Sequence, residues 1–91
     1  MSKNTILVTG SSGFIGFHLS NYLISKKFYI VGVDSLNSYY SVKIKKKRLS
    51  ILKKKKNFSF NKLNLRNKKS LENIFIKYRP SVVIHLAGQP G

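Results

Sequence analysis

Short, continuously apolar runs alternate along the chain with segments whose apolar residues recur at helical spacing. Runs of this kind are typical of parallel strands that are buried on both faces. Four of them predict strands, at Thr5–Thr9, Phe28–Val33, Phe58–Leu63 and Ser81–Ala87. The strands are therefore separated by stretches long enough for a helix each.

The intervening segments predict three helices. The first carries an apolar stripe that we expect to face the sheet, formed by Ile15, Leu19, Tyr22 and Leu23. The second, within 41–56, has a ragged apolar face and a strongly cationic outer face. The third carries the stripe Leu71, Ile74, Phe75 and Tyr78 and should end before Pro80.

Alternating strands and helices predict an α/β fold with a parallel sheet and right-handed crossovers. The expected strand order is 3-2-1-4, which leaves the fourth strand at an open edge. Because that strand is as apolar as an interior one, its edge is a candidate surface for self-association. We expect residues 1–91 to form the N-terminal half of a doubly wound domain.

Composition narrows the class of protein. The 91 residues are 42% hydrophobic and 12% aromatic, which is typical of a globular domain. The absence of cysteine excludes disulfides and thiolate metal sites, and no metal site is expected. No apolar run approaches the roughly 18 residues of a spanning helix, and the N-terminus lacks a signal-peptide core, so we expect a cytoplasmic protein.

The charge is strongly unbalanced, with 18 Lys and Arg against 2 Asp and Glu, a net charge of +16. Such a chain is attracted to nucleic acid, and the basic segment 43–56 leaves open a basic nucleic-acid-binding module. A second alternative is a non-catalytic subunit that completes its sheet with another chain. We favour a compositional origin of the charge, since the lysines occupy positions where a helix face is solvated.

Three glycines, each three residues apart, join the first apolar run to the first helix. Gly10 permits a sharp turn with positive φ, and Gly13 removes a side chain where a pyrophosphate approaches the backbone. Gly16 allows the helix to pack closely on the strand, so that its N-terminal amides point at the phosphates. Asp34, about 20 residues on, can accept hydrogen bonds from ribose hydroxyls. The pattern predicts a dinucleotide-binding Rossmann fold.

The segments TGSSGFIG (9–16), DSLNSYY (34–40) and HLAGQPG (85–91) carry a family resemblance. From residue 6 to residue 91 the chain resembles the N-terminal part of the extended short-chain dehydrogenases/reductases, the NAD-dependent epimerase/dehydratase family. Within it the chain is most similar to UDP-glucuronate 4-epimerases. The resemblance implies the NAD-binding N-terminal segment of a nucleotide-sugar epimerase.

The resemblance also implies roles for individual residues. The pyrophosphate would lie against Gly10, Ser12, Gly13, Phe14, Ile15 and Gly16; the adenosine ribose against Asp34 and Asn37; the adenine against Asn64 and Leu65; and the nicotinamide-side ribose against Leu86, Ala87 and Gly88. An acid at position 34 disfavours the extra phosphate of NADP, so NAD is the expected cofactor. Asn64 replaces the family's usual Asp and can accept the adenine hydrogen bond only without charge.

Epimerases of this family use a Tyr-x-x-x-Lys pair together with a Ser or Thr, and we expect those residues beyond position 91. Two local matches, Tyr22–Lys26 and Tyr39–Lys43, are interpreted as coincidences of helical spacing. His18 and His85 are interpreted as an exposed residue and a hydrogen-bonded structural residue. The chain is therefore expected to contain no catalytic residue, to be inactive alone, and to meet a UDP-sugar only in a full-length form.

Overall fold

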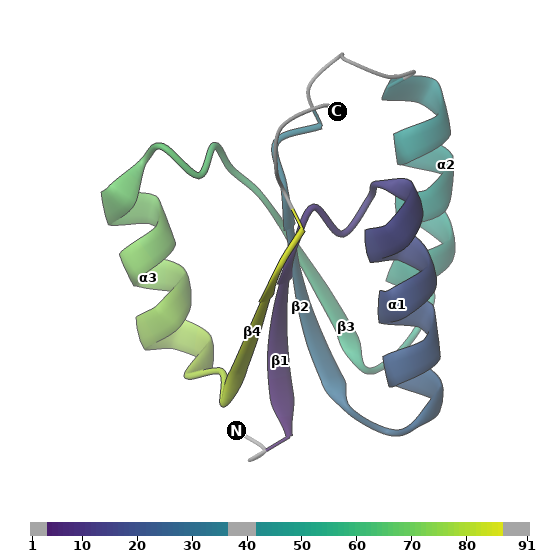
Figure 1. Ribbon diagram of the computed structural model, residues 1–91, viewed down its shortest axis with the longest axis horizontal. Coiled ribbons are helices and arrows are strands. Elements are labelled where there is room, and N and C mark those ends of the chain that lie inside the picture. Colours follow the sequence, from purple (N-terminus) through teal and green to yellow (C-terminus); the bar gives the residue numbers. More distant parts are fainter. Residues whose placement is uncertain (1–3, 37–41, 87–91) are drawn as a thin grey trace.

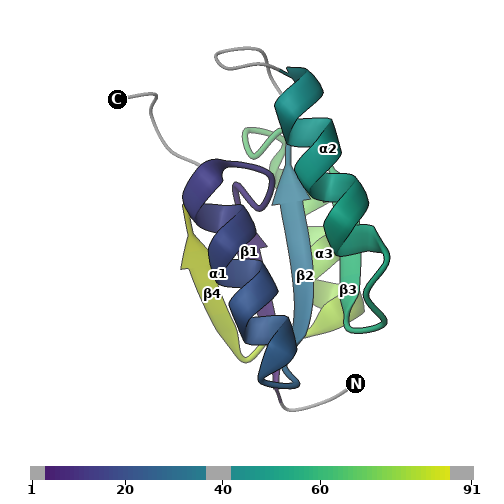
Figure 2. The same cartoon turned by 90° about the vertical axis from the view of Figure 1, so that its right-hand side faces the viewer.

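The strands form one sheet with helices on both faces, as the computed structural model shows for residues 4–36 and 42–86 (Figure 1). Helices α1 and α2 cover one face and α3 covers the other (Figures 1 and 2). The elements are β1 (Thr5–Thr9), α1 (Phe14–Ser25), β2 (Tyr29–Asp34), α2 (Val42–Lys53), β3 (Phe58–Lys62), α3 (Lys68–Tyr78) and β4 (Val82–His85).

All strand pairs are parallel, and their order is β3-β2-β1-β4, which confirms the predicted topology. Leu7 in the central strand β1 pairs with Val31 on one side and with Val83 on the other. The chain therefore proceeds outward from β1 in opposite directions. Ligands of such sheets bind at this reversal, beyond the carboxyl ends of the strands.

Two apolar cores lie on opposite faces of the sheet. Beneath α1 and α2 the buried residues are Ile6, Val8, Ile30, Leu49, Leu52 and Phe58. Beneath α3 they are Leu7, Val31, Val33 and Ile74. Alternate residues of β1 and β2 thus enter different cores, because successive side chains of a strand point to opposite faces.

The predicted sheet-facing stripe of α1 is wrong in two positions. Ile15 is 64% exposed and Tyr22 is 58% exposed, whereas Gly16 and Ser20 are the buried residues of the helix. A Cβ at position 16 would lie 2.0 Å from the Gly10 carbonyl oxygen. The helix approaches the sheet so closely that only small residues fit along its contact line, and the larger ones lie on its flanks.

Element ends differ from the predicted ones by a few residues. Helix α2 ends at Lys53 rather than Lys56, and α3 ends at Tyr78, where Arg79 takes a left-handed conformation with φ 47°. The edge strand β4 ends at His85, and its Val82 and Val83 are nearly half exposed because β4 is the outermost strand of the sheet.

Within residues 4–36 and 42–86, no helix has the length and apolarity needed to cross a bilayer.

Candidate functional site

The first glycine turns the chain at the carboxyl end of β1. Gly10 has φ 73°, a conformation that favours glycine, and its amide donates to the Val33 carbonyl over 2.7 Å. The Gly13 amide then donates back to the Gly10 carbonyl over 3.1 Å. The first bond fastens the turn between β1 and α1 to the end of β2, and the second closes the turn on itself.

Gly13 and Gly16 are glycines for different reasons. The clash at Gly16 is with backbone atoms of Gly10 and Ser11, so the fold itself excludes a side chain there. At Gly13 a Cβ would lie 3.4 Å from the Gly10 carbonyl oxygen, an ordinary contact, and the backbone is extended with φ −72° and ψ 173°. The fold therefore tolerates a side chain at Gly13.

The first turn of α1 offers donors to an anion. Gly13 caps the helix without any side-chain hydrogen bond, and the amides of Phe14, Ile15 and Gly16 have no carbonyl partner within the helix. Beside this turn the hydroxyls of Ser11 and Ser12 are fully buried and find no partner among the described residues. Amides without a partner inside the helix and the positive end of a helix dipole suit a phosphate group.

Asp34 lies at the end of β2, beside this turn, and is buried. Its Oδ2 accepts from the Ser12 amide over 3.0 Å, and its Oδ1 accepts from the Leu36 amide over 2.8 Å. A carboxylate has lone pairs beyond these two bonds, so Asp34 can still accept from hydroxyls of a ligand. The structure thus brings the predicted phosphate site and the predicted ribose acceptor into direct contact.

Helix α2 adds two cations that sequence reasoning missed. Lys45 places its Nζ 3.7 Å from Asp34 Oδ1. Arg48 donates to the Ser12 carbonyl over 3.3 Å, and its guanidinium lies 5.7 Å from the centre of the Phe14 ring. Lys45 and Arg48 lie at helical spacing from the buried Leu49 and Leu52, on the face of α2 that packs against the core. Charged residues on such a face were the sequence signal that could have identified them.

Three of the remaining predicted residues, Asn64, Leu65 and Leu86, follow strands at the same carboxyl edge of the sheet. Leu86 follows β4, and its amide donates to Thr9 Oγ1 over 3.0 Å. Asn64 and Leu65 follow β3 at the opposite end; Asn64 is exposed and its Oδ1 accepts from the Arg66 amide over 2.9 Å. Leu65 packs partly against the α3 core. The predicted residues Asn37, Ala87 and Gly88 lie outside the described residues.

The two histidines occupy the positions that the sequence indicated. His85 Nδ1 lies 2.8 Å from Thr9 Oγ1, so this ring is hydrogen-bonded at the end of β4. His18 is exposed on α1, with its ring 4.7 Å from that of Phe14. The Tyr22–Lys26 match lies at the C-terminal end of α1, at the opposite edge of the sheet from the glycine turn (Figure 2).

A polar cluster also lies beneath α3, away from the glycine turn. The hydroxyls of Tyr29 and Ser59 are hydrogen-bonded to each other across β2 and β3. Burial tends to raise the pKa of Tyr78, but hydrogen bonds from Asn61 and Ser59 and the charge of Lys77 outweigh it and lower that pKa below its ordinary value. None of these groups contacts the site at the carboxyl edge.

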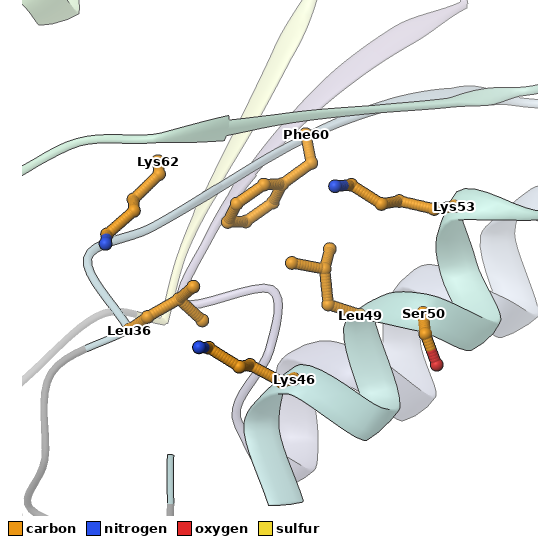
Figure 3. Close-up of a pocket in the computed structure, with 7 residues that line it drawn as sticks. All are labelled: Leu36, Lys46, Leu49, Ser50, Lys53, Phe60 and Lys62. Atoms are coloured by element: carbon orange, nitrogen blue, oxygen red, sulfur yellow. The ribbon is translucent and has the colours of Figure 1, made fainter. Parts of the chain in front are cut away.

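Beyond the end of β2, a shallow pocket of about 570 Å³ lies between α2 and β3 (Figure 3). Its apolar floor is surrounded by ammonium groups, and Lys53 Nζ lies 5.9 Å from the centre of the Phe60 ring. The lining residues are Leu36, Lys46, Leu49, Ser50, Lys53, Phe60 and Lys62. Among the described residues, no predicted cofactor residue lines it, so the pocket is separate from the glycine turn.

An open parallel sheet of order β3-β2-β1-β4, with a glycine turn at its reversal point and an acid after β2, defines the N-terminal half of a Rossmann-type dinucleotide-binding domain. Comparison with known proteins agrees with this class. The family described as GDP-mannose 4,6 dehydratase matches residues 7–91, and the chain belongs to this family, among the NAD-dependent epimerases and dehydratases.

Individual relatives agree as well. Protein CapI of Staphylococcus aureus is 49% identical over 86 residues, which cover 94% of this chain and 25% of that protein. The UDP-glucuronate 4-epimerase of Thermodesulfobacterium geofontis is 44% identical over 85 residues, or 93% of this chain and 26% of the relative. The chain therefore spans about a quarter of the length of these curated relatives.

A solved structure gives the same result. The UDP-glucuronic acid 4-epimerase of Bacillus cereus, in complex with UDP-glucuronic acid and NAD, superposes with a TM-score of 0.85 at 32% identity. The match covers 96% of this chain and 27% of that one. The chain matches the N-terminal NAD-binding region of such enzymes, and these comparisons give no support to a nucleic-acid-binding module or a non-catalytic partner subunit.

Proposed function

We propose that this chain binds the adenosine and pyrophosphate part of NAD as the N-terminal segment of a nucleotide-sugar epimerase of the UDP-glucuronate 4-epimerase type. The observation that carries the proposal is the contact between the Ser12 amide and Asp34 Oδ2 at 3.0 Å. This contact places a phosphate-binding turn beside a ribose acceptor. An adenosine diphosphate carries its pyrophosphate and its ribose next to each other, so the two protein groups match two adjacent parts of the ligand. The relatives that bind NAD are similar over nearly the whole chain.

The residues present fit this cofactor. The amides of Phe14 and Ile15 and the hydroxyl of Ser12 would hold the pyrophosphate, and the bare backbone of Gly13 would allow its close approach. Asp34 would accept from the adenosine ribose. When bound, NAD supplies a hydride acceptor and donor. The part played by this chain is to bind and orient the adenosine end.

The remaining assignments of the predicted site belong to the same proposal. Leu86, with Ala87 and Gly88, would lie beside the nicotinamide-side ribose at the end of β4, and Asn37 would lie near Asp34. Asn64 and Leu65 would lie near the adenine. Because Asn64 already accepts from the Arg66 amide, its adenine bond must use the second lone pair of Oδ1.

Epimerisation itself we assign to a longer form of the protein. Lys26 stacks over the Tyr22 ring at 5.5 Å, far from the glycine turn, so this pair cannot serve a reaction at the nicotinamide. A UDP-sugar would meet residues outside this chain. The open edge of β4, with Val82 and Val83 exposed, would pair with further strands or with a second copy, and the cytoplasm is the proposed location.

The test is a calorimetric titration of the purified chain with NAD. Asp34 and Glu72 are the two acids of the sequence, and Glu72 is exposed on α3, so E72Q is a matched control for D34N. Hydrogen bonds to a charged group contribute about 1.5–3 kcal/mol. We expect D34N to weaken NAD binding about tenfold or more and E72Q to leave it unchanged. Equal affinities of the two variants would refute the ribose assignment.

A further inference from the structure

Lys45 is a nearly buried cation in a chain whose other lysines are mostly exposed. Its side chain is only 13% exposed, and that of Asp34, its partner at 3.7 Å, is 5% exposed. Lys45 also lies near the N-terminal end of α2, which carries no acid in its first turn. A cation at that end of a helix is unfavourable, so the carboxylate of Asp34 offsets the cost of this position.

The ion pair changes the electrostatics of the ribose position. An isolated carboxylate after β2 excludes a 2′-phosphate by charge repulsion. Here the ammonium of Lys45 cancels much of that repulsion, and it retains N–H groups that can donate to a second anion. Since Asp34 also accepts the Ser12 and Leu36 amides, it is held in place when a ligand arrives.

We propose that Lys45 determines how this site discriminates between an adenosine ribose with a free 2′-hydroxyl and one that carries a 2′-phosphate, and that its ammonium forms a subsite for that phosphate beside Asp34. The inference rests on the proposed function, since it assumes that a dinucleotide binds here. NAD remains the preferred ligand because the hydroxyls bond directly to Asp34. NADP is bound more weakly, but it is not excluded.

Arg48 provides the contrast. Its guanidinium contacts the Ser12 carbonyl and the Phe14 ring, on the pyrophosphate side of the site. NAD and NADP are identical in that part of the molecule. Loss of Arg48 should therefore weaken both ligands by the same factor, whereas loss of Lys45 should act mainly on NADP.

The experiment compares the dissociation constants of NAD and NADP, measured by calorimetry at one fixed salt concentration on the complete 91-residue chain. In K45Q the ratio of the NADP constant to the NAD constant should rise about tenfold or more, the effect of losing one hydrogen bond to a charged group. The exposed neighbour Lys47 supplies the control, because K47Q removes the same charge and should leave the ratio unchanged, as should R48Q.

Further variants keep the test decisive if K45Q does not fold. K45R retains the charge and should keep the ratio near that of the wild type. D34N removes the repelling carboxylate beside Lys45, so the ratio should fall. A folded K45Q with an unchanged ratio overturns the inference, and so does a D34N variant whose ratio does not fall.

The wild-type chain separates this inference from the proposed function. Binding of NAD with no detectable binding of NADP overturns the phosphate subsite and leaves the proposed function intact. Binding of neither nucleotide refutes the proposed function and the inference together. Binding of both, with NADP the weaker ligand and a ratio that responds to Lys45 but not to Lys47, supports both.

Discussion

Replacing Gly13 by alanine is expected to weaken NAD binding by at least about a hundredfold while leaving the fold intact. The backbone at Gly13 is extended, and the new Cβ would lie 3.4 Å from the nearest carbonyl oxygen, that of Gly10. Alanine is a poorer N-cap than glycine, at a cost of roughly 1 kcal/mol. The lower entropy of the unfolded chain offsets about 0.4–1 kcal/mol of this. The free energy of unfolding should therefore change by less than about 1 kcal/mol.

The effect on the ligand is larger. In the proposed complex, the added methyl group would lie where the pyrophosphate approaches the amides of Phe14 and Ile15. Each hydrogen bond to a charged group contributes about 1.5–3 kcal/mol, so the loss of two such bonds weakens binding by at least about a hundredfold. Calorimetric titration with NAD and denaturant unfolding followed by circular dichroism measure the two effects separately.

Gly16→Ala is the matched control, because it adds the same methyl group one helical turn away. There the Cβ would lie 2.0 Å from the Gly10 carbonyl oxygen, so α1 must shift on the sheet. Overpacking of this kind costs about 1–3 kcal/mol or more, and G16A should be the less stable variant. A stable G13A variant that binds NAD like the wild type would refute the assignment of the pyrophosphate to this turn. A G16A variant as stable as the wild type would contradict the packing argument.

Three further predictions concern the scaffold. Asn67→Ala removes the side chain that accepts an amide at the start of α3, and should lower the free energy of unfolding by about 1 kcal/mol; an unchanged denaturation midpoint contradicts the cap. Gly32→Ala places a Cβ 2.6 Å from Ser11 Oγ and 2.8 Å from the Phe58 ring, and should cost about 1–3 kcal/mol in the same assay, whereas equal stability contradicts the close packing. Because the pKa of Tyr78 is lowered in the folded chain, its deprotonation favours folding as pH rises through that pKa. The difference in tyrosinate absorbance between the wild type and Y78F measures this, and a midpoint at or above the ordinary tyrosine pKa contradicts it.

The strands and the glycine turn could be predicted because their causes are local. A continuous apolar run is typical of a buried parallel strand, and the turn at Gly10 needs a residue that accepts positive φ. Strand order 3-2-1-4 followed from the dinucleotide-binding pattern of the glycine turn and Asp34, because right-handed crossovers alone allow several orders. The orientation of α1 could not be predicted from the apolar spacing of Ile15 and Tyr22, since it depends on how closely Gly16 approaches Gly10, which is a property of the assembled structure.

The cations of α2 escaped sequence reasoning for a different reason. Among 18 basic residues, Lys45 and Arg48 cannot be distinguished by composition from their solvated neighbours. Only the packing of α2 against the glycine turn separates them, by placing one beside Asp34 and the other on the Ser12 carbonyl. Charged residues that fall on the stripe of Leu49 and Leu52 were the sign that this face of the helix meets something polar.

Among the described residues, the hydrogen bonds that hold the glycine turn join groups in the first part of the chain. Gly10 is tied to Val33, Ser12 to Asp34, and Arg48 to Ser12. During synthesis from the amino end, the groups proposed to hold the pyrophosphate and the adenosine ribose therefore leave the ribosome before Asn64 and Leu65, which are proposed to lie near the adenine. A cofactor that binds this segment stabilises it by mass action.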